Sequence, residues 1–336
     1  SIILMVGAVV VVFLHNVPYK WFQVFPVFLY PISLVLLAFV TLMGIITGDR
    51  VNGAARWMTF MGLQFQPSEL AKMAVIIAVS FILSKRQDEE GANPKAFKYI
   101  MILTGLVLLL IAPENLSTAM LLFGVVFMMM FIGRVAAKKL LLLAGGLVLI
   151  VALGVGTVVA IPAKTLHNTP GLHRLETWQN RIKGFFDKDE VPAAKFDIDK
   201  DAQIAHARIA IATSHVVGKG PGNSIQRDFL SQAFSDFIFA IVIEEMGLIG
   251  GIFVVFLYLC LLMRAGRIAQ KCERTFPAFL VMGIALLLVS QAILNMMVAV
   301  GLFPVTGQPL PLVSKGGTST LINCAYIGMI LSVSRY

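Results

Sequence analysis

The sequence predicts an all-α protein that crosses a membrane many times. Of its 336 residues, 58% are hydrophobic and only 13% are charged, whereas charged residues make up about 25% of an ordinary soluble domain. Long apolar runs recur along the chain, and a helix needs about 20 mainly apolar residues to span a bilayer. Together these observations indicate a polytopic membrane protein.

Eight apolar runs are candidates for spanning helices. They cover residues 24–47, 68–84, 98–112, 115–133, 139–162, 236–263, 275–302 and 317–334. Pro113-Glu114-Asn115 separates two of these runs, which predicts two short helices that meet in a tight turn. The first apolar run, residues 1–14, is too short to span a bilayer. Because neither a signal peptide nor an initiator Met precedes it, we expect the chain to begin inside a helix.

Basic residues are unevenly distributed between the two sets of alternating short loops. One set, with the C-terminus, carries 13 of them: Lys20, Lys85, Arg86, Lys95, Lys98, Arg134, Lys138, Lys139, Arg264, Arg267, Lys271, Arg274 and Arg335. The other set carries three, which are Arg50, Arg56 and Lys315. Cytoplasmic loops are rich in Lys and Arg, so we expect the first set to be cytoplasmic. The net charge of +9 then reflects these loops and does not indicate nucleic-acid binding.

The chain is predicted to form one membrane domain with one long excursion outside the membrane. Residues 1–162 form the N-terminal membrane helices, residues 163–235 an extracytoplasmic loop, and residues 236–336 the C-terminal membrane helices. Within the loop, residues 202–217 are apolar but contain two histidines and an arginine, a pattern that favours an interfacial or re-entrant helix. The following sequence, GKGPGNS, is rich in turn residues and should not remain helical.

Two charged residues, Glu69 and Lys72, begin one predicted span. Ionisable groups at membrane depth cost about 2.5–3.5 kcal/mol to insert, so they imply a partner or a cavity. Pro67 fits the first turn of a helix, and residues three apart pair on one helix face. Two interpretations stay open: a structural ion pair, or a pair that lines a polar cavity, where Lys72 holds an anionic ligand or tunes a neighbouring group.

Further polar groups accompany the last helices. Asp236 opens a predicted span, where it either simply favours the positive end of the helix dipole or carries chemistry. Glu244 and Glu245 lie two turns deeper and are interpreted as buried structural carboxylates. Residues 303–320 contain three prolines and three glycines, which predicts a rigid irregular loop over a cavity. Lys315 in this loop is either solvated or in contact with an anionic headgroup.

Five motifs spaced along the chain carry a family resemblance. They are NGAARW at 52–57, QPSELAK at 66–72, GPGNS at 220–224, SDFIFA at 235–240 followed by Glu244-Glu245, and PLPLVSKGG at 309–317. In this order they resemble the SEDS family, the FtsW/RodA-type peptidoglycan glycosyltransferases. Within this family, the sequence is more similar to the FtsW branch. The resemblance implies a ten-helix, GT-C-like bundle whose first helix and start of the second are absent from this sequence.

The resemblance also implies an activity and a set of site residues. The chain is expected to polymerise lipid II in cell division, by inverting transfer with release of undecaprenyl diphosphate. The resemblance places the catalytic aspartate at Asp236 and a cavity pair at Glu69 and Lys72. Arg56, Lys72 and Lys315 are candidates to bind the diphosphate, as is a divalent cation such as Mg²⁺ or Mn²⁺. The family usually has Tyr where Lys315 stands, and no organic cofactor is expected.

The expected partners follow from the same resemblance. They are lipid II, the undecaprenyl-linked glycan strand, a class B penicillin-binding protein with transpeptidase activity, and division-complex proteins, but no nucleic acid. The expected location is the bacterial inner membrane, with the active site facing the periplasm. Three alternatives stay open: a lipid II flippase or transporter, which needs no base at the outer surface, an elongation-type (RodA-like) polymerase, and a structural scaffold.

The long loop carries one further hypothesis. Within residues 163–201, four apolar side chains recur at helical spacing: Leu175, Trp178, Ile182 and Phe185. This spacing predicts a short amphipathic element over residues 174–186. We expect the element to cover the catalytic cavity, where it gates substrate entry or responds to the partner, and an inert solvated tether is the alternative.

Overall fold

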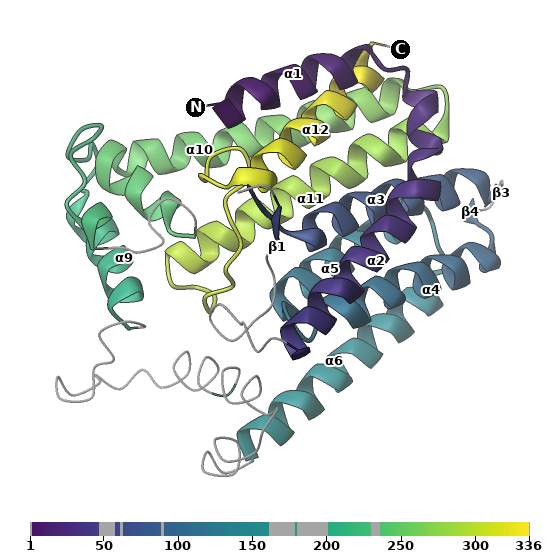
Figure 1. Ribbon diagram of the computed structural model, residues 1–336, viewed down its shortest axis with the longest axis horizontal. Helices are drawn as coiled ribbons and strands as arrows, with labels where there is room; N and C mark the ends of the chain where they lie inside the picture. The colour runs from purple at the N-terminus through teal and green to yellow at the C-terminus, as the bar shows by residue number, and fades with distance from the viewer. Residues whose placement is uncertain are drawn as a thin grey trace. The chain divides into compact units, whose positions relative to one another are not determined.

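The protein is built from long α-helices joined by turns, as a computed structural model shows (Figure 1). The structure describes residues 2–46, 58–60, 63–88, 91–160, 179, 201–229 and 236–335. The helices are α1 (Ile2–Asn16), α2 (Phe25–Ile46), α3 (Pro67–Lys85), α4 (Pro94–Ile111), α5 (Leu116–Ile132), α6 (Ala137–Ala160), α9 (Asp201–Thr213), α10 (Ile238–Lys271), α11 (Thr275–Ala299) and α12 (Gly317–Ser334). Short 3-10 turns lie at Tyr19–Gln23 (η1) and Gln226–Asp228 (η3).

The only strands in the described ranges form two small antiparallel hairpins. In the first, β1 (Met58–Phe60) pairs with β2 (Leu63–Phe65), with Met58 opposite Phe65. In the second, β3 (Gln87–Asp88) pairs with β4 (Gly91–Ala92). Neither hairpin is long enough to change the fold class, so the prediction of an all-α protein is confirmed.

Seven helices in the described ranges are long and apolar enough to cross a membrane, namely α2, α3, α4, α6, α10, α11 and α12. Helices α1 and α5 are shorter apolar helices. Each of the eight predicted runs corresponds to one helix, which confirms a multi-pass membrane protein. The largest difference is in α10, which starts at Ile238 and continues to Lys271. Its last turns carry Arg264, Arg267 and Lys271, so the helix continues beyond the apolar run into a basic segment.

The predicted turn between α4 and α5 is also confirmed. Helix α4 ends at Ile111, whose carbonyl oxygen accepts a hydrogen bond from the Asn115 amide at 2.7 Å. The Asn115 side chain then accepts a hydrogen bond from the Thr118 amide at 3.2 Å. Asn115 therefore serves as the N-cap that starts α5 and satisfies one of its free amides.

The chain forms two compact units, each described by itself. The first comprises Ser1–Leu140, Val255–Ala292 and Pro309–Tyr336, and the second comprises Leu141–Val254 and Ile293–Gln308. In the first unit, α3 is the central helix, since 72% of its span is buried and it packs against α2, α4, α5 and α12. The domain boundaries predicted at 162 and 235 adjoin residues outside the described ranges and stay a prediction.

The second unit contains a broken helix. Within α10, Gly247 has φ 72° and ψ −172°, so the helical hydrogen-bond ladder is interrupted there. A side chain at this position would place its Cβ 2.2 Å from the Val216 carbonyl oxygen, so only glycine fits. Helix α9 confirms that the predicted segment 202–217 is helical as far as Thr213, four residues short of the predicted end. Gly218, Gly220 and Gly222, all with positive φ, confirm the turn-rich segment that follows.

The segment after α9 satisfies the backbone groups that the break in α10 exposes. The amides of Lys219 and Gly220 donate to the carbonyl oxygens of Glu244 and Glu245 at 3.0 and 2.8 Å. On the other side of the break, the Leu248 amide donates to the His215 carbonyl oxygen at 3.3 Å. Buried backbone groups need such partners, so residues 215–220 take the place of one helical turn.

Candidate functional site

Glu69 and Lys72 form a buried ion pair on α3, as their spacing predicts. Lys72 Nζ lies 2.8 Å from Glu69 Oε1, and the two residues are 0% and 2% exposed. Pro67 occupies the first turn of α3 with Gln66 as the N-cap, which fixes where the pair sits along the helix. A buried charge is tolerated when it is paired and hydrogen-bonded, and this arrangement meets both conditions.

The pair is extended by a glutamine from α11. Lys72 Nζ donates to Gln291 Oε1 at 2.9 Å, and Gln291 Nε2 donates to the Pro309 carbonyl oxygen at 3.0 Å. The lysine is therefore held by two side chains and fully enclosed in this conformation. An anionic ligand would have to replace one of these contacts, so the substrate-binding role of Glu69 and Lys72 stays a prediction.

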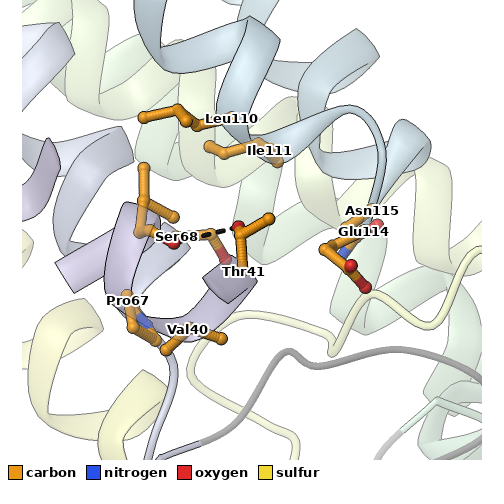
Figure 2. Close-up of a pocket in the computed structure, with 9 residues that line it drawn as sticks. Val40, Thr41, Pro67, Ser68, Leu110, Ile111, Glu114 and Asn115 are labelled. Atoms are coloured by element: carbon orange, nitrogen blue, oxygen red, sulfur yellow. Dashed lines mark hydrogen bonds between the residues drawn. The ribbon is translucent and has the colours of Figure 1, made fainter. Parts of the chain in front are cut away.

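Pro67 and Ser68, which directly precede Glu69, line a small, partly open pocket with room for about one water molecule (Figure 2). Its walls come from α2, α3 and the turn between α4 and α5: Leu37, Val40, Thr41, Pro67, Ser68, Leu110, Ile111, Glu114 and Asn115. Five of the nine lining residues are apolar, and the other four are polar: Thr41, Ser68, Glu114 and Asn115.

The loop between α11 and α12 has the irregular, fixed structure that its prolines and glycines predict. The Leu310 amide donates to Ser314 Oγ at 2.7 Å, and the Ser314 amide donates to the Leu310 carbonyl oxygen at 2.9 Å. The Tyr258 hydroxyl donates to the Pro311 carbonyl oxygen. Lys315 directly follows this hydrogen-bonded turn. Its side chain is exposed, so it is accessible to a ligand.

Asp236 lies two residues before the start of α10 and is half-buried. The first carbonyl that the helix uses is that of Phe237, which accepts from the Ala240 and Ile241 amides. Asp236 is therefore just outside the helix and not its first residue, a difference of two residues from the predicted span. The positive end of the α10 dipole still favours a carboxylate at this place.

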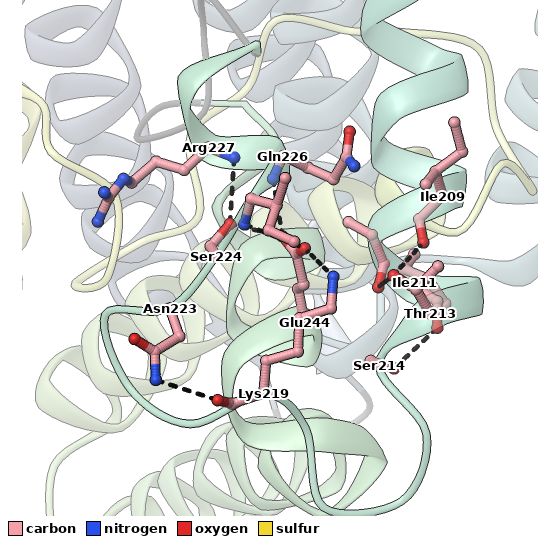
Figure 3. A network of polar contacts seen from close by, with 12 residues as sticks. Ile209, Ile211, Thr213, Ser214, Lys219, Asn223, Ser224, Gln226, Arg227 and Glu244 are labelled. Atoms are coloured by element: carbon pink, nitrogen blue, oxygen red, sulfur yellow. Dashed lines mark hydrogen bonds and ion pairs between the residues drawn. The ribbon is translucent and has the colours of Figure 1, made fainter.

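Glu244 is fully buried and holds together the segment that bridges the break in α10 (Figure 3). Its carboxylate accepts from Lys219 Nζ at 2.6 Å and from Ser224 Oγ at 2.5 Å, and from the amides of Ile225 and Gln226 at 3.3 Å each. These contacts confirm the interpretation of Glu244 as a buried structural carboxylate. Glu245 is half-buried.

Three important residues were not identified from the sequence. Lys219 is 25 residues from Glu244, so no helical spacing could have indicated the pair. Gln291 and Asn295 lie on α11, in an otherwise apolar stretch, and they are four residues apart. That spacing places two amides on one face of a buried helix, a signal that was available in the sequence.

Two of the predictions fall on residues outside the described ranges. Arg56, with the rest of the motif at 52–57, is one of them. The other is the amphipathic element at 174–186, of which the structure describes only Gln179. Both stay predictions.

The cysteines take no part in these clusters. Cys260, Cys272 and Cys324 are all free. Cys272 Sγ donates to the Ile268 carbonyl oxygen at 3.2 Å, and burial raises the pKa of this thiol, which makes it a poor nucleophile. Within the part of the chain that the structure describes, no group of three His, Cys, Asp or Glu residues is arranged to hold a metal ion.

Comparison with known proteins gives consistent matches over the whole length. The family model described as cell cycle protein, which covers FtsW, RodA and SpoVE, matches residues 1–336. A relative from Trichlorobacter lovleyi, named "Probable peptidoglycan glycosyltransferase FtsW", is 33% identical over 98% of this chain and 81% of its own length. A relative from a Geobacter species with the same name is 35% identical over 95% of this chain and 80% of its own length.

Two solved structures share the fold. One comes from a study of the structural coordination of polymerization and crosslinking by a peptidoglycan synthase complex, with a TM-score of 0.76 and 26% identity. The match covers 100% of this chain and 88% of the other. The other is the rod shape determining protein RodA of Thermus thermophilus, with a TM-score of 0.66 and 25% identity, over 100% of this chain and 86% of RodA.

Proposed function

This chain belongs to the FtsW/RodA/SpoVE family of cell cycle proteins, and we propose that it is a membrane-embedded peptidoglycan glycosyltransferase that polymerises lipid II during cell division. The names of its relatives support the reaction and the process. The observation that carries the mechanism is Asp236, a half-buried carboxylate at the start of a membrane helix, with its backbone held by a side chain from α11.

The reaction joins the 4-hydroxyl of an acceptor GlcNAc to C1 of a donor MurNAc. The new C1–O bond forms as the C1–O bond to undecaprenyl diphosphate breaks, with inversion at C1. Asp236 accepts the proton of the attacking hydroxyl, and a general base of this kind contributes about 10²–10⁴-fold to a rate. The base must be ionised before the reaction, which the N-terminal end of α10 favours.

Positive charge must stabilise the departing diphosphate. Lys315, in the loop between α11 and α12, has an exposed side chain and is available for this role. Lys72 takes part when the diphosphate replaces one of its two contacts, those with Glu69 and Gln291. Arg56 is the third cation assigned to the diphosphate.

A divalent cation, Mg²⁺ or Mn²⁺, accompanies the diphosphate in this proposal as part of the substrate. The described residues offer no cluster of three His, Cys, Asp or Glu residues for such an ion. Polymerisation should decline when the purified enzyme and lipid II are treated with EDTA, and it should recover when Mg²⁺ or Mn²⁺ is added back in excess. Full activity in EDTA would remove the cation from the proposal.

The proposed orientation places the catalytic side in the periplasm and the basic loops in the cytoplasm of a bacterial inner membrane. In support, the α3–α4 and α10–α11 connections carry Lys85, Arg86, Arg274 and their neighbours, and cytoplasmic loops are rich in such residues. Reporter fusions in these two connections should be active on the cytoplasmic side, and a fusion at the α4–α5 turn should be active on the periplasmic side.

The proposed partner is a class B penicillin-binding protein, which crosslinks the strands that this chain makes. The likeness to a synthase complex that coordinates polymerization and crosslinking supports this assignment. Co-expression with the transpeptidase encoded in the same genome should give a complex that survives purification in mild detergent. Other division-complex proteins are expected to join it at the division site.

The test of the function is a reconstitution with labelled lipid II. Purified enzyme, with and without the transpeptidase, should convert lipid II into long glycan strands that a gel resolves. Two features, a buried ion pair and a broken helix, also occur in transporters, so lipid II translocation in vesicles should be measured in parallel. Translocation without strand formation would favour a flippase, and a rod-to-sphere change on depletion, without filaments, would favour an elongation-type polymerase.

A further inference from the structure

Asn295 on α11 makes two hydrogen bonds with one amide nitrogen. Its Nδ2 donates to the Asp236 carbonyl oxygen at 2.8 Å and to the Gln308 carbonyl oxygen at 2.8 Å. Both acceptors are carbonyl oxygens, so the nitrogen of the amide must face them and the orientation of the side chain is unambiguous. Asn295 is 1% exposed, so water does not compete for these contacts.

The contact reaches the backbone of Asp236 where the helix does not hold it. Helical hydrogen bonding in α10 begins with the Phe237 carbonyl, so the Asp236 carbonyl lies outside the helical ladder. A side chain from another helix, 59 residues along the chain, supplies the hydrogen bond in its place. The same amide holds the backbone carbonyl of Gln308, the residue that directly precedes Pro309 in the loop that carries Lys315.

The two ends of the Asn295 amide differ in their hydrogen bonding to the described residues. Asn295 Oδ1 is buried and has no hydrogen-bond partner within the described ranges. An unsatisfied buried acceptor costs free energy, so the oxygen does not explain why asparagine stands here, whereas loss of the nitrogen would leave the Asp236 and Gln308 carbonyl oxygens without these hydrogen bonds. The two donated hydrogen bonds are therefore the property that requires asparagine at this position.

We infer that Asn295 is a positioning residue for the glycosyl transfer. By its hydrogen bond to the Asp236 backbone carbonyl, it holds the Asp236 carboxylate within reach of the attacking hydroxyl. The inference rests on the proposed function, because it takes Asp236 as the base. A general base acts only within hydrogen-bond reach of the proton it removes, and a displacement of about 1 Å can lower a rate by about 10²-fold. Asn295 acts through Asp236 and has no direct role at the reacting atoms.

The test compares two substitutions of Asn295 with a matched control. Asn295→Leu keeps the branching and the number of side-chain heavy atoms but removes both N–H donors, and Asn295→Asp keeps the shape but turns oxygen atoms toward the two carbonyls. Asn323→Leu is the control, because Asn323 is also buried, on α12, and has no assigned role. Turnover and KM for lipid II are measured on purified, reconstituted protein with its transpeptidase partner, together with the thermal unfolding temperature.

A positioning role predicts that the substitutions of Asn295 change kcat but not KM. Both Asn295 variants should lower kcat by about 10²-fold and leave KM for lipid II unchanged, since Asn295 does not contact the substrate. Asn323→Leu should retain the wild-type kcat. A normal kcat in Asn295→Leu would overturn the inference, and so would a rise in KM without a loss of kcat.

The same experiment separates this inference from the proposed function. If Asp236→Asn polymerises lipid II normally, the assignment of the base is wrong. If Asp236→Asn is inactive while Asn295→Leu has normal turnover, only the positioning role is wrong. Unfolding of both Asn295 variants, with Asn323→Leu intact, would assign Asn295 a purely structural role and would also overturn the inference.

Discussion

Lys72 and Gln291 are 219 residues apart in the sequence, yet Lys72 Nζ lies 2.9 Å from Gln291 Oε1. Because Glu69 holds the same ammonium at 2.8 Å, the charge is compensated by one ionic and one neutral acceptor. The Nε2 atom of Gln291 in turn donates a hydrogen bond to the Pro309 carbonyl oxygen. One glutamine of α11 therefore links helix α3 to the loop before α12 by hydrogen bonds. A substitution of Lys72 should alter the position of Gln291 and, through it, of that loop.

Removing Lys72 should be much more harmful than removing a surface lysine. Lys72→Ala leaves Glu69 as a buried, uncompensated charge, and breaking a buried pair in this way costs about 3–5 kcal/mol. We expect a lower thermal unfolding temperature in detergent and a loss of polymerisation. Lys138→Ala is the control, because Lys138 is exposed, and it should match the wild type in both assays.

A double variant separates stability from substrate binding at this pair. Glu69→Gln with Lys72→Met removes both charges, and replacing a buried pair by neutral groups is often close to neutral for stability. The double variant should therefore recover the unfolding temperature but stay inactive if Lys72 binds the diphosphate. Recovery of polymerisation as well would show that the pair is only structural.

Asp236→Asn should eliminate glycan polymerisation without disturbing the fold. The substitution keeps the size of the side chain but removes the base, so the rate should fall by about 10²–10⁴-fold. Membrane expression and the unfolding temperature should stay at wild-type values. Near-wild-type polymerisation would mean that another group takes the proton from the acceptor hydroxyl.

The fold and part of the site could be predicted because their signals are local. Apolar runs of about 20 residues located the spanning helices, and the three-residue spacing of Glu69 and Lys72 gave their ion pair. The break at Gly247 could not be predicted, because the residues that hydrogen-bond to the backbone on either side of it, 215–220, are distant in the sequence. Gly250 and Gly251 nearby look equally able to break a helix. Asn295 and Gln291 matter because of the carbonyl oxygens that they reach, and only the tertiary structure supplies those partners.

The pair between Lys219 and Glu244 should respond asymmetrically to substitution. Lys219 is 27% exposed at its side chain, whereas Glu244 is fully buried. Lys219→Ala leaves a buried carboxylate without its cation, while Glu244→Gln leaves a lysine that can turn to water. We expect Lys219→Ala to destabilise the protein by about 3 kcal/mol and Glu244→Gln by about 1–2 kcal/mol.

Limited proteolysis checks this expectation locally. The segment 215–227 hydrogen-bonds to the broken part of α10, so its loosening should expose a cleavage site near Lys219 or Arg227. Since Lys219→Ala removes one trypsin site, chymotrypsin cleavage at Phe229 is the appropriate readout. Equal effects of the two variants would contradict the asymmetry of burial.

Gly247→Ala should be strongly destabilising, although alanine is normally the better helix former. The φ of 72° is unfavourable for a residue with a side chain, and the new Cβ would lie 2.2 Å from the Val216 carbonyl oxygen. Backbone strain of this kind costs about 1–3 kcal/mol, and the steric conflict adds to it by displacing residues 215–220. The unfolding temperature of the purified protein should fall, and polymerisation should fall with it.

Gly266→Ala on the same helix is the matched control with the opposite expected sign. Gly266 lies in the helical part of α10, and, apart from the adjoining helix backbone, no atom of the described residues would lie within 4 Å of a Cβ there. Replacing a helical glycine by alanine stabilises by about 0.5–1 kcal/mol, so the unfolding temperature should rise slightly while activity is unchanged. If Gly247→Ala also raised the unfolding temperature, the break would not be a required part of the fold, and residues 215–220 could not be standing in for a helical turn.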